Sequence, residues 1–266
     1  MQYSAPESAS QFLRTAILAA EAAAGISARF YRENLTISIK DDRSPVTDAD
    51  VACEQAIRRI ILEAFPEHGF YGEETGRSNA DSEYTWLVDP IDGTKGFIRE
   101  YPFFSTQIAL MHQGEIIVGV SCAAMMNELA CAERGAGAWL NGKRIRVSNV
   151  STLENAAVST GNLKSLAGAA GWGQLAKLIL ATDRIRGYGD FYHYHLLASG
   201  KIDVVLESDV NILDIAALSI IVAEAGGVFT DLDGRKPGLD TRTVLASTPA
   251  LHDELRQRFA GWDAQA

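Results

Sequence analysis

The chain has 266 residues, with 24 lysines and arginines against 34 aspartates and glutamates, so its formal net charge is −10. Hydrophobic residues make up 47% and charged residues 22%, an ordinary globular composition that excludes a disordered, collagen-like or low-complexity chain. The length fits one large domain or two modest ones. No stretch approaches about 18 uninterrupted apolar residues, which excludes a membrane span. The apolar stretch 12–26 contains Arg14 and Glu21, so we do not expect it to be a signal peptide.

The cysteines and the net charge narrow the class of protein. The three cysteines lie far apart and form no C-x-x-C pair: Cys53, Cys122 and Cys131. This argues against a disulfide framework and a zinc site, and it suits a reducing cytoplasm. An acidic chain without a run of lysine or arginine is a poor nucleic-acid binder. If such a protein acts on a phosphate, something other than side-chain cations must attract that anion.

The first half of the chain predicts two helices followed by strands. Residues 8–32 predict an amphipathic helix, because apolar residues recur at intervals of three and four from Phe12 to Phe30. A second helix begins at Thr47, where Thr47 and Asp50 make a T-x-x-D capping box, and Pro66 ends it. Short runs bounded by Gly, Pro or Asn then predict strands at 85–88, 107–111, 115–121 and 128–132. We expect this half to be an antiparallel sheet covered by helices.

The pattern changes near residue 150. Helices are predicted at 171–181, 190–199, 213–225 and 250–259. They alternate with predicted strands near Ala157, Ile185, Val204, Val228 and Val244. We therefore expect two subdomains: an N-terminal α+β part at 1–150, and a C-terminal α/β part at 151–266 that contains Asp214.

The segment 86–94, W-L-V-D-P-I-D-G-T, is the most informative stretch. Asp89 at a strand end and Asp92 on the following turn can point into one pocket. The amide groups that open a short helix near 94–98 would face the same pocket and suit a phosphate. Carboxylates this close repel each other unless a cation lies between them, and hard divalent ions such as Mg²⁺ prefer oxygen ligands. Taken alone, the motif is equally consistent with aspartates acting as ordinary turn residues.

Two further acidic features lie elsewhere in the chain. Gly72-Glu73-Glu74 follows the short apolar segment 69–71, and Asp214 opens a predicted helix that ends in the sequence E-A-G-G at 224–227. Each has a simpler explanation by itself. An acidic pair is typically a solvated surface feature, and an aspartate in the first turn of a helix interacts with the helix dipole. Their combination with the segment 86–94 favours a shared site.

In chain order, the segments 44–50, 72–74, 89–94 and 214–227 resemble the successive signatures of the inositol-monophosphatase superfamily, and the resemblance covers nearly the whole chain. It implies an α+β fold, the layered α-β-α-β-α sandwich of the inositol-monophosphatase and fructose-bisphosphatase type, assembled as a homodimer. It also implies hydrolysis of phosphomonoesters with two or three Mg²⁺ ions per active site, for which Mn²⁺ is an alternative.

Carried over residue by residue, the resemblance implies two metal sites. Glu73, Asp89 and the backbone carbonyl of Ile91 would bind one ion. Asp89, Asp92 and Asp214 would hold a second.

The resemblance also implies catalytic roles. Thr94, with Glu73, would orient and deprotonate the metal-bound water that attacks phosphorus, and Asp50 would anchor the Thr94 hydroxyl. The backbone amides of Gly93 and Thr94 would receive phosphate oxygens. The family often has Trp directly before the third metal-binding Asp, where this chain has Leu213. That neighbour packs rather than ligates, so the metal assignment is unaffected.

The expected substrate rests on local features. Lys95 after D-G-T, the stretch R-G-Y-G-D-F at 186–191, and Glu207 resemble the branch of the superfamily that hydrolyses L-histidinol phosphate to L-histidinol in histidine biosynthesis. Asp190 and Glu207 would hold the amine and imidazole of that substrate. Asp190 is equally consistent with an N-cap after Gly189. Lys95 also occurs in the nucleotide-phosphate phosphatases of the superfamily.

Other functions remain open at this point. The nearest alternative is an inositol-1-phosphate or broad-specificity phosphatase with the same core. A catalytically inactive relative kept as a binding protein is disfavoured, because the complete set of ligands is present. His193 and His195 are two apart on a predicted helix and point to different faces, so we interpret them as structural or surface residues and not as zinc ligands.

Overall fold

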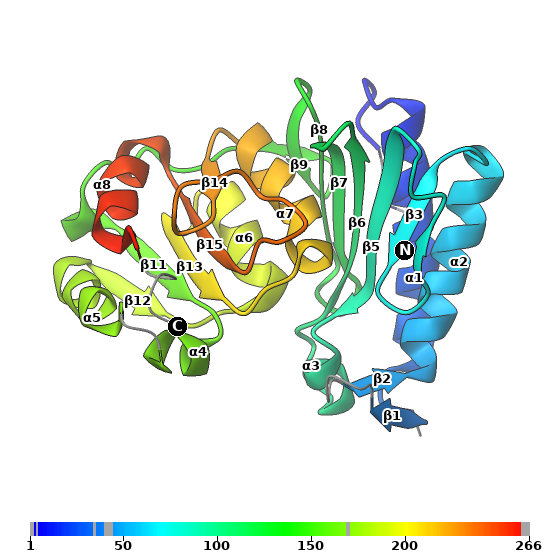
Figure 1. Ribbon diagram of the computed structural model, residues 1–266, viewed down its shortest axis with the longest axis horizontal. Coiled ribbons are helices and arrows are strands. Elements are labelled where there is room, and N and C mark those ends of the chain that lie inside the picture. The colour runs from blue at the N-terminus through cyan, green and yellow to red at the C-terminus, as the bar shows by residue number, and fades with distance from the viewer. Residues whose placement is uncertain (1–2, 4, 34–35, 40–44, 169–170, 262–266) are drawn as a thin grey trace. The chain divides into compact units, whose positions relative to one another are not determined.

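The structure, a computed structural model, describes residues 3, 5–33, 36–39, 45–168 and 171–261 (Figure 1). The chain divides into two compact units: Met1–Arg144 with Leu213–Ile221, and Ile145–Ile212 with Val222–Ala266. The sequence-based division at residue 150 placed Asp214 in the C-terminal subdomain. Asp214 instead belongs to the first unit, because its helix packs on the sheet of that unit. No helix in the described ranges is long and apolar enough to cross a membrane.

Two long helices of the first unit, α1 (Gln11–Phe30) and α2 (Asp48–Ala64), lie side by side (Figure 1). The hydroxyl of Ser10 caps α1 by accepting a hydrogen bond from the Leu13 amide at 3.2 Å. The predicted capping box begins α2: the Thr47 hydroxyl accepts from the Ala49 amide, and the Asp50 carboxylate accepts from the Thr47 amide. The cap of α2 is therefore the one that the sequence indicated, whereas the Ser10 cap of α1 is a finding of the structure.

The described residues of this unit form an eight-stranded sheet with the order β10-β9-β8-β7-β6-β5-β3-β4. Neighbours from β5 to β9 are antiparallel, whereas β3 runs parallel to β5. The four predicted strands correspond to β5 to β8. The strands are β3 (Gly69–Gly72), β4 (Gly76–Ser78), β5 (Tyr84–Asp92), β6 (Ser105–His112), β7 (Glu115–Ala123), β8 (Glu128–Glu133), β9 (Gly137–Leu140) and β10 (Lys143–Ile145). A separate pair, β1 (Ile37–Ile39) and β2 (Pro45–Thr47), is antiparallel.

The two faces of this sheet pack against different helices. Successive residues of a strand point to opposite faces, so neighbouring positions on β7 show both contacts. Val118 and Val120 of β7 belong to the buried cluster that includes Leu13 of α1. Gly119 between them faces α7 (Ile212–Glu224), where a Cβ would lie 2.5 Å from the Ala217 carbonyl oxygen. This close approach requires glycine and holds the first half of α7 against the sheet.

The second unit contains a five-stranded sheet in its described part, with the order β12-β11-β13-β15-β14. The strands are β11 (Ala157–Thr160), β12 (Arg184–Arg186), β13 (Val204–Ser208), β14 (Val228–Thr230) and β15 (Thr243–Ser247). β11 is parallel to β12 and β13, and β15 is antiparallel to β13 and β14. The helices are α4 (Leu163–Gly168), α5 (Trp172–Ala181), α6 (Asp190–Ala198) and α8 (Pro249–Phe259). The predicted mixed α/β class is confirmed.

Candidate active site

The end of β5 brings two aspartates to one face of the sheet. Asp89 pairs with Gln107 of β6 and Asp92 with Ser105, so two residues between them on β5 oppose a single residue on β6. Without this bulge, side chains three apart would point to opposite faces; the extra residue turns both carboxylates the same way. The Ile91 amide donates to Asp89 Oδ1 at 2.9 Å and the Thr106 hydroxyl donates to the Pro90 carbonyl at 2.9 Å, which fixes the turn.

Asp89, Asp92 and Asp214 form a cluster in which one carboxylate oxygen of each lies within 4.8 Å of the others. Asp89 and Asp92 are buried and Asp214 is half-buried. Glu73, which follows β3, shares a side-chain hydrogen bond with Asp89. Burial raises the pKa of Asp89 well above its ordinary value, and the charges of Glu73, Asp214 and Asp92 raise it further. The structure thus unites four carboxylates that the sequence analysis assigned to metals.

The chemistry of this donor set fits a hard divalent cation. All the donors are oxygens, which is what Mg²⁺ and Mn²⁺ prefer, and they include no histidine or cysteine. Gln107, directly opposite Asp89 on β6, is fully buried and donates from Nε2 to the hydroxyls of Ser105 and Ser121 at 2.7 and 3.1 Å. Its Oε1 is a buried oxygen without a hydrogen-bond partner, on the residue that pairs with Asp89.

Asp50 and Thr94 contact each other in the structure. The Thr94 hydroxyl lies 3.3 Å from Asp50 Oδ1 and 3.0 Å from the Ile91 carbonyl oxygen. Asp50 Oδ2 accepts from the amide and the hydroxyl of Thr47 at 2.8 and 2.6 Å. Burial raises the pKa of Asp50, the bonds from Thr47 oppose that shift, and the Glu73 charge adds to it. One carboxylate therefore makes the capping contact and the Thr94 contact together. Ser44, the first residue of the 44–50 motif, lies outside the described residues.

Gly93 introduces α3 (Thr94–Ile98) in a conformation that only glycine tolerates well. Its φ is +92°, and a Cβ at this position would lie 2.8 Å from the Phe103 carbonyl oxygen. The backbone at 93–94, which the sequence analysis assigned to phosphate binding, therefore follows the turn that carries Asp92.

Asp190 and Glu207 belong to the second unit and differ in their surroundings. Asp190 is exposed at the start of α6, and the N-cap position is held by Gly189. Glu207 on β13 is buried: its Oε2 accepts from the Tyr194 hydroxyl at 2.7 Å and lies 3.0 Å from His193 Nε2. His193 Nδ1 lies 3.3 Å from the Ser159 hydroxyl. Both histidines of α6 are buried, which supports the structural interpretation of His193 and His195 and excludes the surface one.

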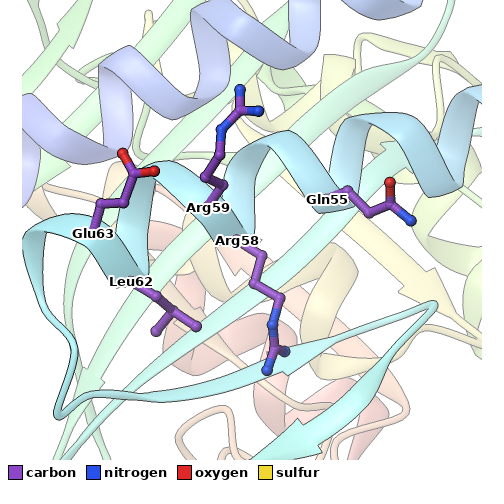
Figure 2. A pocket seen from close by; sticks show the side chains of 5 residues that line it. All are labelled: Gln55, Arg58, Arg59, Leu62 and Glu63. Atoms are coloured by element: carbon purple, nitrogen blue, oxygen red, sulfur yellow. The ribbon is translucent and has the colours of Figure 1, made fainter.

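A hollow on the outer surface of α2 is separate from these residues. Figure 2 shows its lining side chains, with Arg58 pointing to one side of the helix and Arg59 and Glu63 to the other. The hollow is lined by Gln55, Arg58, Arg59, Leu62 and Glu63. Arg58 donates to the Ser78 hydroxyl at 3.0 Å and lies over the Phe70 ring. None of the predicted site residues lines the hollow.

Comparison with known proteins decides the family. Residues 8–261 match the inositol monophosphatase family. The chain belongs to that family. As a member of the inositol monophosphatase family it is an enzyme of the phosphoric monoester hydrolase class, and the resemblance found in the sequence is confirmed.

Individual relatives of this inositol monophosphatase family member carry more than one name. It is 40% identical over 239 residues to a histidinol-phosphatase of Mycobacterium tuberculosis, covering 87% of this chain and 90% of the relative. It is 35% identical over 254 residues to an inositol-1-monophosphatase of Caulobacter vibrioides, covering 91% and 98%. The crystal structure of the extragenic suppressor protein suhB from Bartonella henselae superposes with a TM-score of 0.86 at 32% identity, covering 94% and 98%. The predicted fold class is confirmed.

Proposed function

We propose that this phosphatase is a Mg²⁺-dependent phosphomonoesterase that hydrolyses L-histidinol phosphate to L-histidinol, with Mn²⁺ as an alternative ion. The observation that carries the proposal is the cluster of Asp89, Asp92 and Asp214 beside Glu73. Glu73, Asp89 and the Ile91 carbonyl would hold one ion, and Asp89, Asp92 and Asp214 a second. When bound, the ions neutralise phosphate charge and lower the pKa of water.

Side chains and backbone amides of the chain position the attacking water, accept its proton and bind the phosphate. The Thr94 hydroxyl, oriented by Asp50 and the Ile91 carbonyl, positions the attacking water. Glu73 accepts the proton that this water loses. The amides of Gly93 and Thr94 donate to phosphate oxygens. No protein nucleophile is required, so the reaction transfers the phosphoryl group directly to water.

The choice of substrate rests on Asp190 and Glu207. Histidinol phosphate carries an amine cation, and carboxylates bind such a cation through charge-assisted hydrogen bonds. The exposure of Asp190 and the 40% identity to the mycobacterial relative support this substrate. One observation favours an inositol-phosphate or broad-specificity activity instead: Glu207 Oε2 already accepts from Tyr194 and lies beside His193.

A phosphate-release assay separates these substrates. The purified protein with MgCl₂ would be supplied in turn with histidinol phosphate, inositol-1-phosphate, fructose-1,6-bisphosphate and 3′-phosphoadenosine-5′-phosphate. We expect the highest kcat/KM for histidinol phosphate. A preference for inositol-1-phosphate would establish the alternative, and no release from any of the four would contradict the phosphatase proposal.

The homodimer and the cytoplasmic location belong to the same proposal. All three cysteines of the chain are buried free thiols, as expected for a protein of a reducing compartment. Burial raises the pKa of each thiol to about 12, so these cysteines are poor nucleophiles at neutral pH.

A further inference from the structure

A fifth carboxylate lies next to the four of the site but is not one of the predicted ligands. Glu54 of α2 is fully buried. Its Oε2 accepts a hydrogen bond from the Glu74 amide at 2.7 Å, and its Oε1 accepts one from the Thr75 amide at 2.8 Å. Both oxygens are thus bonded to the backbone that directly follows Glu73.

The same carboxylate packs against the backbone that precedes Glu73. A Cβ placed on Gly72 would lie 2.5 Å from Cδ and from both carboxylate oxygens of Glu54. Residue 72 must therefore be glycine for Glu54 to occupy this position. Glu54 contacts the chain on both sides of Glu73 and leaves no room there for another side chain.

Glu73 is held from a second direction by the strand that carries Asp89. Its amide donates to the carbonyl of Val88, the residue before Asp89, at 3.1 Å. With the backbone fixed to β5 on one side and to Glu54 on the other, the Glu73 side chain meets that of Asp89. The contact between these two carboxylates is therefore set by main-chain bonds.

We propose that Glu54 is a positioning residue: it fixes the backbone around Glu73 so that Glu73 and Asp89 face one divalent cation. The inference rests on the proposed function. A carboxylate is needed because two backbone donors meet one side chain, and a carboxylate has only acceptors. A glutamine would satisfy one amide and direct its own NH₂ group at the other. Residues that orient metal ligands typically contribute about 10- to 100-fold to metal affinity.

Titration calorimetry with MgCl₂ alone tests the proposal on the full chain. Glu54→Gln should weaken Mg²⁺ binding about 10-fold or more, whereas the wild type and Glu63→Gln should bind equally. Glu63 is an exposed carboxylate on the outer face of the same helix, so it is the matched control (Figure 2). Gly72→Ala approaches the same contact from the other side and should weaken Mg²⁺ binding in the same way, even if Glu54→Gln folds poorly.

A double-mutant cycle separates positioning from general stability. If Glu54 acts through Glu73, adding Glu54→Gln to Glu73→Gln should change Mg²⁺ affinity by no more than about two-fold. Unchanged affinity in Glu54→Gln and Gly72→Ala, with a lower melting temperature, would overturn the proposal and leave a purely structural role. An equal loss with and without Glu73 would also overturn it. A wild-type protein that binds no divalent cation would contradict the proposed function itself, which distinguishes the two failures.

Discussion

The carboxylate of Asp50 connects the first turn of α2 to the Thr94 hydroxyl: its Oδ2 accepts two bonds from Thr47, and its Oδ1 lies 3.3 Å from Thr94 Oγ1. Two oxygens of one side chain therefore serve two segments that are far apart in the sequence. Because Oδ2 is fixed by the cap, Oδ1 has little freedom, and the orientation of the Thr94 hydroxyl follows from the way α2 begins.

Thr94→Ala should reduce kcat about 100-fold and change KM little, because the hydroxyl that orients the attacking water is lost while the phosphate-binding amides remain. Thr94→Ser retains a hydroxyl and should recover most of the rate. Steady-state kinetics of phosphate release measure both values. A change confined to KM would assign Thr94 to substrate binding.

Gly119→Ala should disturb the contact between β7 and α7. The added methyl group would lie 2.5 Å from the Ala217 carbonyl oxygen and from Ile220 Cγ2, and such overpacking costs about 1–3 kcal/mol in the free energy of unfolding. Because Asp214 is in the first turn of α7, Mg²⁺ affinity should fall as well. Gly25→Ala is the control, since a Cβ there meets nothing within 4 Å. Equal stability of the two variants in urea unfolding would refute the close-packing argument.

Asp190→Asn and Glu207→Gln should have different consequences. Neutralising exposed Asp190 should lower kcat/KM for histidinol phosphate about 10- to 100-fold, with a much smaller loss for an uncharged ester. Glu207→Gln should in addition lower the free energy of unfolding by about 1–3 kcal/mol, because the oxygen that contacts both Tyr194 and His193 would become that of an amide, a weaker acceptor than a carboxylate. Kinetics on both esters and urea unfolding test this. Equal losses on both esters would show that Asp190 does not contact the leaving group.

His252 on α8 predicts a pH dependence of stability. Its ring nitrogens lie 3.2 Å from the Thr230 hydroxyl and 3.1 Å from that of Ser247, and it is buried. Burial lowers the pKa of His252, Asp253 opposes the shift, and Arg256 adds to it. The unfolded state therefore binds this proton more readily, so its contribution to stability is present above about pH 6.5 and is lost as the pH falls toward the folded pKa.

His252→Gln should remove that pH dependence. The difference in free energy of unfolding between wild type and variant should be largest at pH 8 and should shrink at pH 5.5. A difference that is the same at both pH values would mean that His252 does not titrate differently in the folded and unfolded states.

Local sequence patterns predicted the helices other than α4, the central strands and the two aspartates of β5 well. The capping box at Thr47 and the bond from the Ile91 amide to Asp89 involve neighbours within a few residues, so they are readable from the chain itself. The need for glycine at position 93 also depends on the distant Phe103 carbonyl. The four strands from β5 to β8 appeared as apolar runs bounded by turn residues. By contrast, β9 and β10 are short and close to glycines, and no clear periodicity distinguished them.

Local sequence patterns could not predict the contacts between segments that are far apart in the chain. Asp214 was predicted as a ligand by resemblance, but its membership in the first unit depends on the contact of α7 with Gly119. Glu54 was missed because its partners are the amides of residues 74 and 75. The sequence did contain one signal for Glu54: it is a charged residue beside the apolar face of α2, directly after Cys53 and three residues before Ile57. The engagement of Glu207 by His193 likewise requires β13 and α6 to be folded together.

Metal-dependent hydrolysis centred on Asp89 is tested most directly by the rate of phosphate release from histidinol phosphate as MgCl₂ is added to metal-free protein, for the wild type and for Asp89→Asn. We expect no release by the metal-free wild type, recovery on addition of Mg²⁺, and no recovery in Asp89→Asn although that variant folds. Substantial release by metal-free wild type, or by Asp89→Asn with Mg²⁺, would contradict a metal-dependent reaction centred on Asp89.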